Sequence, residues 1–315
     1  MTLDDIKAAA ERIRGVALRT PVIEIDRKGG HSGPPAITLK CEHLQPMGAF
    51  KIRGAFNMIA QLSAAARAAG VITYSSGNHG QAVALAAQRL GIAAVVVMPE
   101  TAPRIKVDGV RRYGGEVMFA GTTSLDRKAR AESEMAARGL TMVPPFDHPW
   151  IIAGAGTCGL EMLEQCPALS TVFVPVGGGG LISGVATAIK RTRPAVRVIG
   201  VEPAGAPKMS ASRAAGHPVT LDRTSSIADG LLALRPGDLT FAHVRAFVDE
   251  VVTVTDAEIA GAVRWLFREA DVTAEPSGAA SVAAARRAGL IGPGTVAIVS
   301  GGNVQPEDFV KYVEG

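Results

Sequence analysis

The sequence has few of the residues that mark several protein classes. It contains three cysteines, Cys41, Cys158 and Cys166, with no Cys-x-x-Cys pair, which disfavours a disulfide scaffold or zinc ribbon and favours a reducing compartment. Aromatic residues make up 4% of the chain and its charges are not gathered into blocks, so nucleic-acid binding has little support. The longest apolar runs, such as Ile92 to Met98, are far shorter than the ~18–20 residues of a membrane helix. We therefore expect a soluble, cytoplasmic protein that binds neither nucleic acid nor membranes.

Glycine, by contrast, is abundant. The 315 residues include 36 glycines, which is above the usual ~7%, and they follow no collagen-like period. They gather in short clusters, most densely at residues 177–180. Such clusters predict loops in which bare backbone must approach a ligand or another segment closely.

Short β-branched segments alternate with alanine-rich segments along most of the chain. Strands are predicted at 71–74, 92–98, 116–119, 140–143, 171–176, 196–201, 251–254 and 295–299, and helices at 3–14, 81–90, 103–113, 124–138, 159–166, 181–191, 256–269 and 277–287. Residues 203–236 are rich in Gly, Pro, Ser and Ala and are predicted to be mostly irregular. This alternation is typical of parallel sheets covered on both faces, and a break near 147–150 divides it. The sequence predicts an α/β fold with two parallel-sheet units.

The strongest single motif places four consecutive glycines, Gly177, Gly178, Gly179 and Gly180, between a predicted strand and a predicted helix. Backbone N–H groups can converge there, and the helix N-terminus adds positive potential, as in a phosphate site. A P-loop is excluded because no Lys-Ser/Thr pair follows the glycines. A dinucleotide site would use Glu202, about 20 residues on, but no register fits G-x-G-x-x-G. The motif therefore favours a small cofactor with one phosphate, and close helix–strand packing is the alternative.

Three further motifs lie where ligands bind in α/β proteins. Ser75-Ser76-Gly77-Asn78-His79-Gly80-Gln81 follows a strand and opens a helix, and its side chains and amides suit a carboxylate or phenolate. Ser300-Gly301-Gly302-Asn303 follows the last predicted strand, at a strand end where such sheets bind ligands. The third, Met47-Gly48-Ala49-Phe50-Lys51-Ile52-Arg53-Gly54-Ala55, contains Lys51. Taken alone, the first of these motifs also fits a capping loop with a structural histidine, and Lys51 also fits a surface lysine.

Together, and in this order, the four motifs resemble the fold-type II pyridoxal-phosphate enzymes, in the branch of threonine/serine dehydratases and serine racemases. The resemblance extends from Arg19-Thr20-Pro21 to Asn303. It implies two parallel-sheet domains of the tryptophan synthase β-like kind, with pyridoxal 5'-phosphate in the cleft between them. The large domain would comprise residues 1–69 plus 148–315 and the small domain residues 70–147. It also implies a homodimer acting on a small amino acid substrate.

The resemblance implies a role for each matching residue. Lys51 would form the Schiff base with the cofactor aldehyde, and its freed amine would remove the α-proton of the substrate. Asn78 would bond the phenolic oxygen and Ser300 would face the ring nitrogen. The remaining cofactor contacts would be Phe50, Gly177, Gly178, Gly179, Gly180, Leu181 and Gly230. The substrate carboxylate would bind the loop of Ser75, Ser76, Gly77, Asn78 and His79.

The implied reaction is the dehydration and deamination of a β-hydroxy amino acid, L-threonine or L-serine, to a 2-oxo acid and ammonia. Two alternatives on the same scaffold are an amino acid racemase and a hydroxyaspartate-type dehydratase. Ser76 supports them, because enzymes of both kinds in this branch tend to carry Ser at that position. A hydroxyl there could also exchange the α-proton from the side opposite Lys51. Two alternatives lie outside the resemblance: a nicotinamide-dependent oxidoreductase using Gly177–Gly180 and Glu202, and a non-catalytic phosphate-ligand binding protein.

The chain departs from the family pattern at several points. Ala49 replaces a serine that usually precedes the Phe-Lys pair. Where the racemase branch holds a divalent cation, Glu202 is retained, but Lys208 stands in place of the expected Asp. An ammonium cannot ligate a cation, so we predict no bound metal and a Lys208 that pairs with Glu202 in its stead. The chain stops soon after Asn303, so no regulatory domain is expected to follow.

Overall fold

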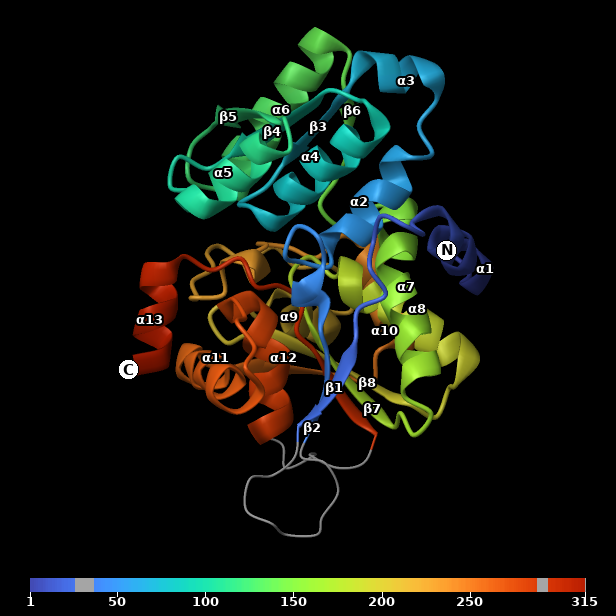
Figure 1. Ribbon diagram of the computed structural model, residues 1–315, viewed down its shortest axis with the longest axis vertical. Helices are drawn as coiled ribbons and strands as arrows, with labels where there is room; N and C mark the ends of the chain where they lie inside the picture. The colour runs from blue at the N-terminus through green and yellow to red at the C-terminus, as the bar shows by residue number, and fades with distance from the viewer. Residues whose placement is uncertain (26–36, 288–293, 315) are drawn as a thin grey trace.

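The computed structural model describes residues 1–25, 37–287 and 294–314, and their strands form two sheets (Figure 1). The larger sheet has six strands in the order β1-β2-β10-β7-β8-β9, and the smaller has four in the order β5-β4-β3-β6. The strands of the larger sheet are β1 (Val22–Ile25), β2 (Ile37–Lys40), β7 (Thr171–Pro175), β8 (Arg197–Pro203), β9 (Glu250–Val254) and β10 (Thr295–Ile298). Those of the smaller sheet are β3 (Val71–Tyr74), β4 (Ala94–Met98), β5 (Glu116–Phe119) and β6 (Thr141–Met142).

The strand pairing confirms the α/β class with two parallel-sheet units. Every pair in the smaller sheet is parallel, and so are the pairs that join β2, β10, β7, β8 and β9. The strand β4 is buried along its whole length, as its unbroken apolar run requires when helices cover both faces of a sheet. The edge pair β1–β2 is antiparallel, a feature that the sequence analysis did not anticipate.

Helices cover both sheets, and α2 lies at the junction between them (Figure 1). Around the larger sheet these are α1 (Leu3–Arg12), α7 (Pro149–Gln165), α8 (Gly180–Thr192), α9 (Lys208–Ala215), α10 (Asp238–Phe247), α11 (Asp256–Ala270), α12 (Pro276–Arg287) and α13 (Pro306–Glu314). Nearer the smaller sheet are α2 (Lys51–Ile59), α3 (Ala64–Ala69), α4 (Asn78–Leu90), α5 (Arg104–Arg112) and α6 (Ser124–Arg138). Two 3₁₀ turns are η1 (Glu42–Leu44) and η2 (Asp229–Leu231). No helix in these described ranges is long and apolar enough to cross a membrane.

Residues 203–236 are mostly irregular, as predicted, although they contain α9 and η2. One prediction of secondary structure needs correction. The helix predicted at 159–166 begins ten residues earlier, at Pro149. Pro149 occupies the first helical position, and the His148 side chain accepts a hydrogen bond from the Trp150 amide, so both favour an N-terminus there.

Helix α2 connects the two sheet units. It packs against α4 beside the smaller sheet and against α7 beside the larger one. The smaller sheet lies within residues 71–142, and the division into 1–69 plus 148–315 and 70–147 stays a proposal. Because α2 begins at Lys51, this arrangement places that lysine between the two units.

Candidate active site

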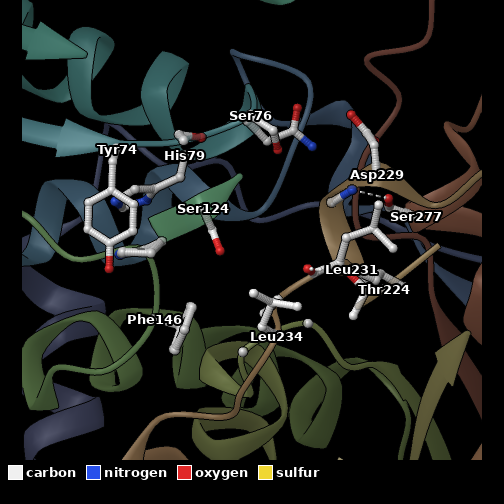
Figure 2. A pocket seen from close by; sticks show the side chains of 18 of the residues that line it. Tyr74, Ser76, His79, Ser124, Phe146, Thr224, Asp229, Leu231, Leu234 and Ser277 are labelled. Carbon is white, nitrogen blue, oxygen red and sulfur yellow. Dashed lines mark hydrogen bonds between the residues drawn. The ribbon is translucent and has the colours of Figure 1, made fainter. Parts of the chain in front are cut away.

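The four sequence motifs meet in a pocket of about 590 Å³ between the two sheets. In Figure 2, Ser76 and His79 enter it from the smaller-sheet side and Asp229 and Ser277 from the larger-sheet side. The predicted site residues that line it are Phe50, Lys51, Ser75, Ser76, Asn78, His79, Gly177, Gly178, Gly179, Gly180, Leu181, Gly230 and Ser300. The pocket lies beyond the carboxyl ends of β3, β7 and β10, where parallel sheets bind ligands.

Lys51 is the first residue of α2, and its half-buried side chain lies in the pocket wall. Its Nζ donates a hydrogen bond to the Pro145 carbonyl oxygen at 2.8 Å and lies 5.2 Å from the centroid of the Phe50 ring. Burial lowers the pKa of this amine to about 8, so part of it is neutral near pH 7. The Phe50 amide donates to the Ser300 carbonyl oxygen at 3.1 Å. This bond fastens the start of α2 to the end of β10 and fixes the lysine relative to Ser300.

The glycine loop, residues 177–180, has no room for side chains. A Cβ at Gly178 would lie 2.3 Å from the Phe146 ring, and one at Gly179, whose φ is +102°, would lie 2.8 Å from Thr240. Helix α8 begins at Gly180, so the N–H groups of the first turn have no partner within the helix. Within the described part of the chain, the amides of Gly178, Gly179, Gly180 and Leu181 donate to no acceptor. These free donors at a helix N-terminus fit a phosphate group.

The Ser75–His79 loop connects β3 to α4. The Ser75 hydroxyl accepts a hydrogen bond from the Gly77 amide at 3.0 Å, whereas the Ser76 hydroxyl makes none with the residues that the structure describes. The His79 Nε2 lies 3.0 Å from the Val143 carbonyl oxygen, and burial together with the Lys51 charge lowers its pKa to about 3. His79 is therefore neutral at physiological pH. Gly77 does not line the pocket, because the Lys106 side chain lies against its α-carbon.

Small neutral groups lie on the opposite side of the pocket. The Ser300 hydroxyl is 3.5 Å from the Ser277 carbonyl oxygen, and the Ser277 hydroxyl accepts a hydrogen bond from the Gly230 amide at 2.9 Å. A Cβ at Gly230 would lie 2.9 Å from that hydroxyl. A neutral Ser300 can exchange a hydrogen bond with a heterocyclic nitrogen without adding a negative charge beside it.

Several charged residues of this pocket were missed by the sequence analysis. Lys106, Asp229 and Glu275 meet there, with Lys106 Nζ 2.6 Å from Asp229 Oδ2 and 3.2 Å from Glu275 Oε2. Arg127 lines the outer part, and its Nε is buried with no hydrogen-bond partner among the described residues. A single acid in the apolar stretch before a predicted helix could have drawn attention to Glu275. No motif or spacing in the sequence relates Lys106, Asp229 and Arg127 to one another.

The predicted pairing of Lys208 with Glu202 is present beneath the pocket. Both side chains are fully buried, and Lys208 Nζ lies 3.5 Å from Glu202 Oε2. The ammonium donates to the carbonyl oxygens of Val176 at 2.7 Å, Leu231 at 2.9 Å and Ala206 at 3.2 Å. It thereby ties the residue before the glycine loop to η2. The ammonium itself stands among these acceptors, and no group of three or more His, Cys, Asp or Glu side chains that could hold a metal ion occurs in the described residues.

Comparison with known proteins agrees with the resemblance that the four motifs indicate. The sequence profile described as "Pyridoxal-phosphate dependent enzyme" matches residues 13–301. The chain is 41% identical over 306 residues to the biosynthetic L-threonine dehydratase of Pasteurella multocida, a match that covers 97% of this chain and 58% of that protein. It is 40% identical over 314 residues to the serine racemase of Schizosaccharomyces pombe, covering 99% of this chain and 97% of the racemase.

The fold is similar as well. The maize serine racemase structure superposes with a TM-score of 0.92 at 40% identity, and the match covers 99% of this chain and 97% of that one. The chain thus spans nearly all of the racemases but less than two thirds of the Pasteurella dehydratase.

Proposed function

Because this chain belongs to the family of pyridoxal-phosphate dependent enzymes, we propose that it dehydrates and deaminates L-threonine or L-serine to a 2-oxo acid and ammonia. The observation that carries the proposal is the convergence of a half-buried lysine, free amides at a helix N-terminus and a neutral Ser300 in one pocket. The relatives are named as threonine dehydratases and as serine racemases, so the experiments below measure both dehydration and racemisation.

The residues of the pocket fit pyridoxal phosphate, the cofactor of this family. The glycine loop and the Leu181 amide would hold its phosphate, Asn78 its phenolic oxygen, and Ser300 its ring nitrogen. Phe50 and Gly230 would lie against the ring. When bound, the cofactor supplies an electron sink that acidifies the α-hydrogen of an amino acid.

Lys51 would act twice in this site. Its amine would attach the cofactor covalently and, once released by the incoming amino acid, would remove the α-hydrogen. A pKa near 8 suits that role, because the neutral amine needed to accept a proton is present at physiological pH. The Ser75–His79 loop, with the amides at the N-terminus of α4, would orient the substrate carboxylate.

The proposal is tested with a panel of β-hydroxy amino acids supplied to the cofactor-loaded enzyme. L-Serine, L-threonine and both diastereomers of 3-hydroxyaspartate are assayed for 2-oxo acid, for ammonia and for inversion at Cα. We expect stoichiometric oxo acid and ammonia from serine or threonine. Inversion without ammonia from every substrate would show a racemase instead, and no turnover of any substrate would overturn the proposal.

Ser76 is the residue that favours racemisation as a second activity. Its hydroxyl lines the pocket and is not held by a hydrogen bond to the described residues, so it is available to exchange a proton with Cα. We expect Ser76→Ala to lower the racemisation rate by about 100-fold or more and the elimination rate much less. Chiral chromatography together with an ammonia assay measures both. An equal loss of the two rates would show that Ser76 only binds the substrate.

Arg127 favours an acidic substrate as a second candidate. Thr123 caps helix α6, so the pocket faces the positive end of this helix and the guanidinium in its first turn. Figure 2 shows Ser124 beside the same space. Arg127 Nη1 donates to the Thr122 carbonyl oxygen at 3.3 Å, which leaves Nε without a partner in the described chain. Such a group suits the β-carboxylate of a hydroxyaspartate.

If Arg127 binds a second carboxylate, Arg127→Gln should lower kcat/KM for 3-hydroxyaspartate by about 10–100-fold, and that for L-serine by less than about threefold. Arg130→Gln, one turn further along α6 and about half exposed, is the control. Equal effects of Arg127→Gln on both substrates would argue against an acidic one.

We also propose that the protein is a homodimer and that it acts in the cytoplasm. Sedimentation of the cofactor-loaded protein tests the first proposal and cell fractionation the second.

A further inference from the structure

The side-chain amide of Asn78 is held at both ends. Its Oδ1 accepts a hydrogen bond from Asn303 Nδ2 at 2.9 Å, and its Nδ2 donates to Glu275 Oε1. Asn303 is oriented in turn, because its Nδ2 also donates to the Met47 carbonyl oxygen at 2.9 Å. If the Asn78 amide were flipped, its oxygen would face the Glu275 carboxylate and its N–H groups would face the N–H groups of Asn303. One orientation is therefore fixed, and it leaves one N–H of Asn78 for the pocket.

Glu275 is fixed by contacts that cross the pocket. Lys106, on α5 beside the smaller sheet, approaches both Glu275 and Asp229 of η2. The side chains of Lys106 and Glu275 are 4% and 2% exposed, so this contact is shielded from solvent. The Glu275 amide also donates to the Gly301 carbonyl oxygen at 3.1 Å. The carboxylate that orients Asn78 is thus attached to both sheet units.

Two glycines of the sequence motifs make room for these contacts. A Cβ at Gly301 would lie 2.2 Å from Glu275 Oε1, and a Cβ at Gly77 would lie 2.1 Å from Lys106 Cδ. Neither glycine has a φ in the left-handed region, since that of Gly77 is 166° and that of Gly301 also lies outside it. Their lack of a side chain is therefore explained by space for Glu275 and Lys106 and not by backbone conformation.

We propose that Glu275 and Asn303 are positioning residues that act through Asn78, fixing which of its N–H groups faces the phenolic oxygen of the cofactor. Lys106 extends this arrangement to the smaller sheet, because its ammonium forms an ion pair with the second oxygen of Glu275. The inference rests on the proposed function, in which Asn78 contacts that oxygen. It adds two residues, one immediately before α12 and one in the segment after β10, that do not touch the cofactor themselves.

The test is a double-mutant cycle on cofactor affinity, measured without substrate by titrating the visible absorbance of bound pyridoxal phosphate. We expect Asn78→Ala to weaken binding about tenfold and Asn303→Ala to weaken it by a large part of that factor. The double variant should bind no more weakly than Asn78→Ala alone, because both changes remove the same contact. Effects that multiply in the double variant would overturn the proposal.

Two further variants keep the test decisive. Asn303→Asp preserves size but sets an oxygen against Asn78 Oδ1, so it should weaken binding at least as much as Asn303→Ala; an unchanged affinity would overturn the proposal. Glu275→Gln should also weaken binding, and its effect should likewise vanish in the Asn78→Ala background. Gln305→Ala is the matched control, because that side chain makes no hydrogen bond to the described residues.

This outcome is separable from failure of the proposed function. If the wild-type protein takes up no pyridoxal phosphate, the proposed function fails before the cycle begins. If it does, but Asn303→Ala leaves the affinity unchanged while Asn78→Ala lowers it, the positioning proposal alone is wrong.

Discussion

Replacing Lys51 with alanine is expected to abolish turnover, with kcat at least ~10³-fold lower, and to remove the visible absorbance of the bound cofactor. The change deletes the covalent attachment and the base together. Both functions are carried by one amine, which lies against Phe50 and Pro145. The other lysine of the pocket, Lys106, is paired with Asp229 and Glu275, so we do not expect it to replace Lys51. Steady-state assays of 2-oxo acid release and absorbance spectra measure the two losses.

Borohydride reduction of the wild-type holoenzyme identifies the attached residue directly. Mass spectrometry should find the label on Lys51 and not on Lys128, which is 52% exposed on α6 and serves as the control for adventitious reaction. A small primary amine added to Lys51→Ala should restore a fraction of turnover, because it can enter the space of the lysine side chain and accept the α-proton. Label on another lysine, or full activity without Lys51, would contradict the assignment.

The sequence was sufficient to predict segments that line the pocket, because each motif is a local unit. A strand end, a run of glycines and a helix N-terminus are adjacent in the chain, so Gly177–Gly180, the Ser75–His79 loop and Ser300 could each be recognised by pattern. Gly177–Gly180 and Ser300 lie close together because the carboxyl ends of β7 and β10 share an edge of the larger sheet. The Ser75–His79 loop follows β3 of the smaller sheet, and it meets them only through the placement of the two sheet units. Lys51 does not follow a predicted strand directly, and it was identified only through its order relative to the other motifs.

The contacts that could not be predicted are long-range. Lys106, Asp229 and Glu275 come from α5, η2 and the N-terminal side of α12, and nothing local sets their separation. Helix α7 was predicted too short for a related reason. Its glycines lower helix propensity, but they permit close packing: a Cβ at Gly154 would lie 2.4 Å from the Arg53 carbonyl oxygen, and one at Gly156 2.9 Å from that of Gly184. Tertiary packing thus outweighs intrinsic propensity there.

The second large effect is expected on stability, at Lys208. Lys208→Met should lower the free energy of unfolding by about 3–5 kcal/mol, because removing one member of a buried pair leaves the other charge uncompensated. Among the described residues, the Glu202 carboxylate would keep only the Met209 and Ser210 amides as partners. The carbonyl oxygens of Val176 and Leu231 would lose their shared donor. Urea unfolding of the cofactor-free proteins measures the difference.

A double variant separates charge from packing in that effect. If the cost comes from the unpaired carboxylate, Glu202→Gln combined with Lys208→Met should be more stable than Lys208→Met alone, even though more native groups have been changed. A double variant as unstable as the sum of the two single changes would assign the loss to packing and to the carbonyl groups.

Experiments on Lys208 also test whether its ammonium replaces a divalent cation in this chain. The three carbonyl oxygens and one carboxylate around Lys208 are the acceptors that a hard cation would use. Chelation of wild-type enzyme should leave activity unchanged, whereas Lys208→Asp should make it depend on added magnesium or calcium, since two buried carboxylates then need a counter-ion. Wild-type activity that falls on chelation and returns with the metal would show the prediction to be wrong. Because the Lys208 ammonium is part of the chain, it holds the end of the strand before the glycine loop at any concentration of magnesium or calcium. The position of that loop therefore does not depend on a bound metal ion.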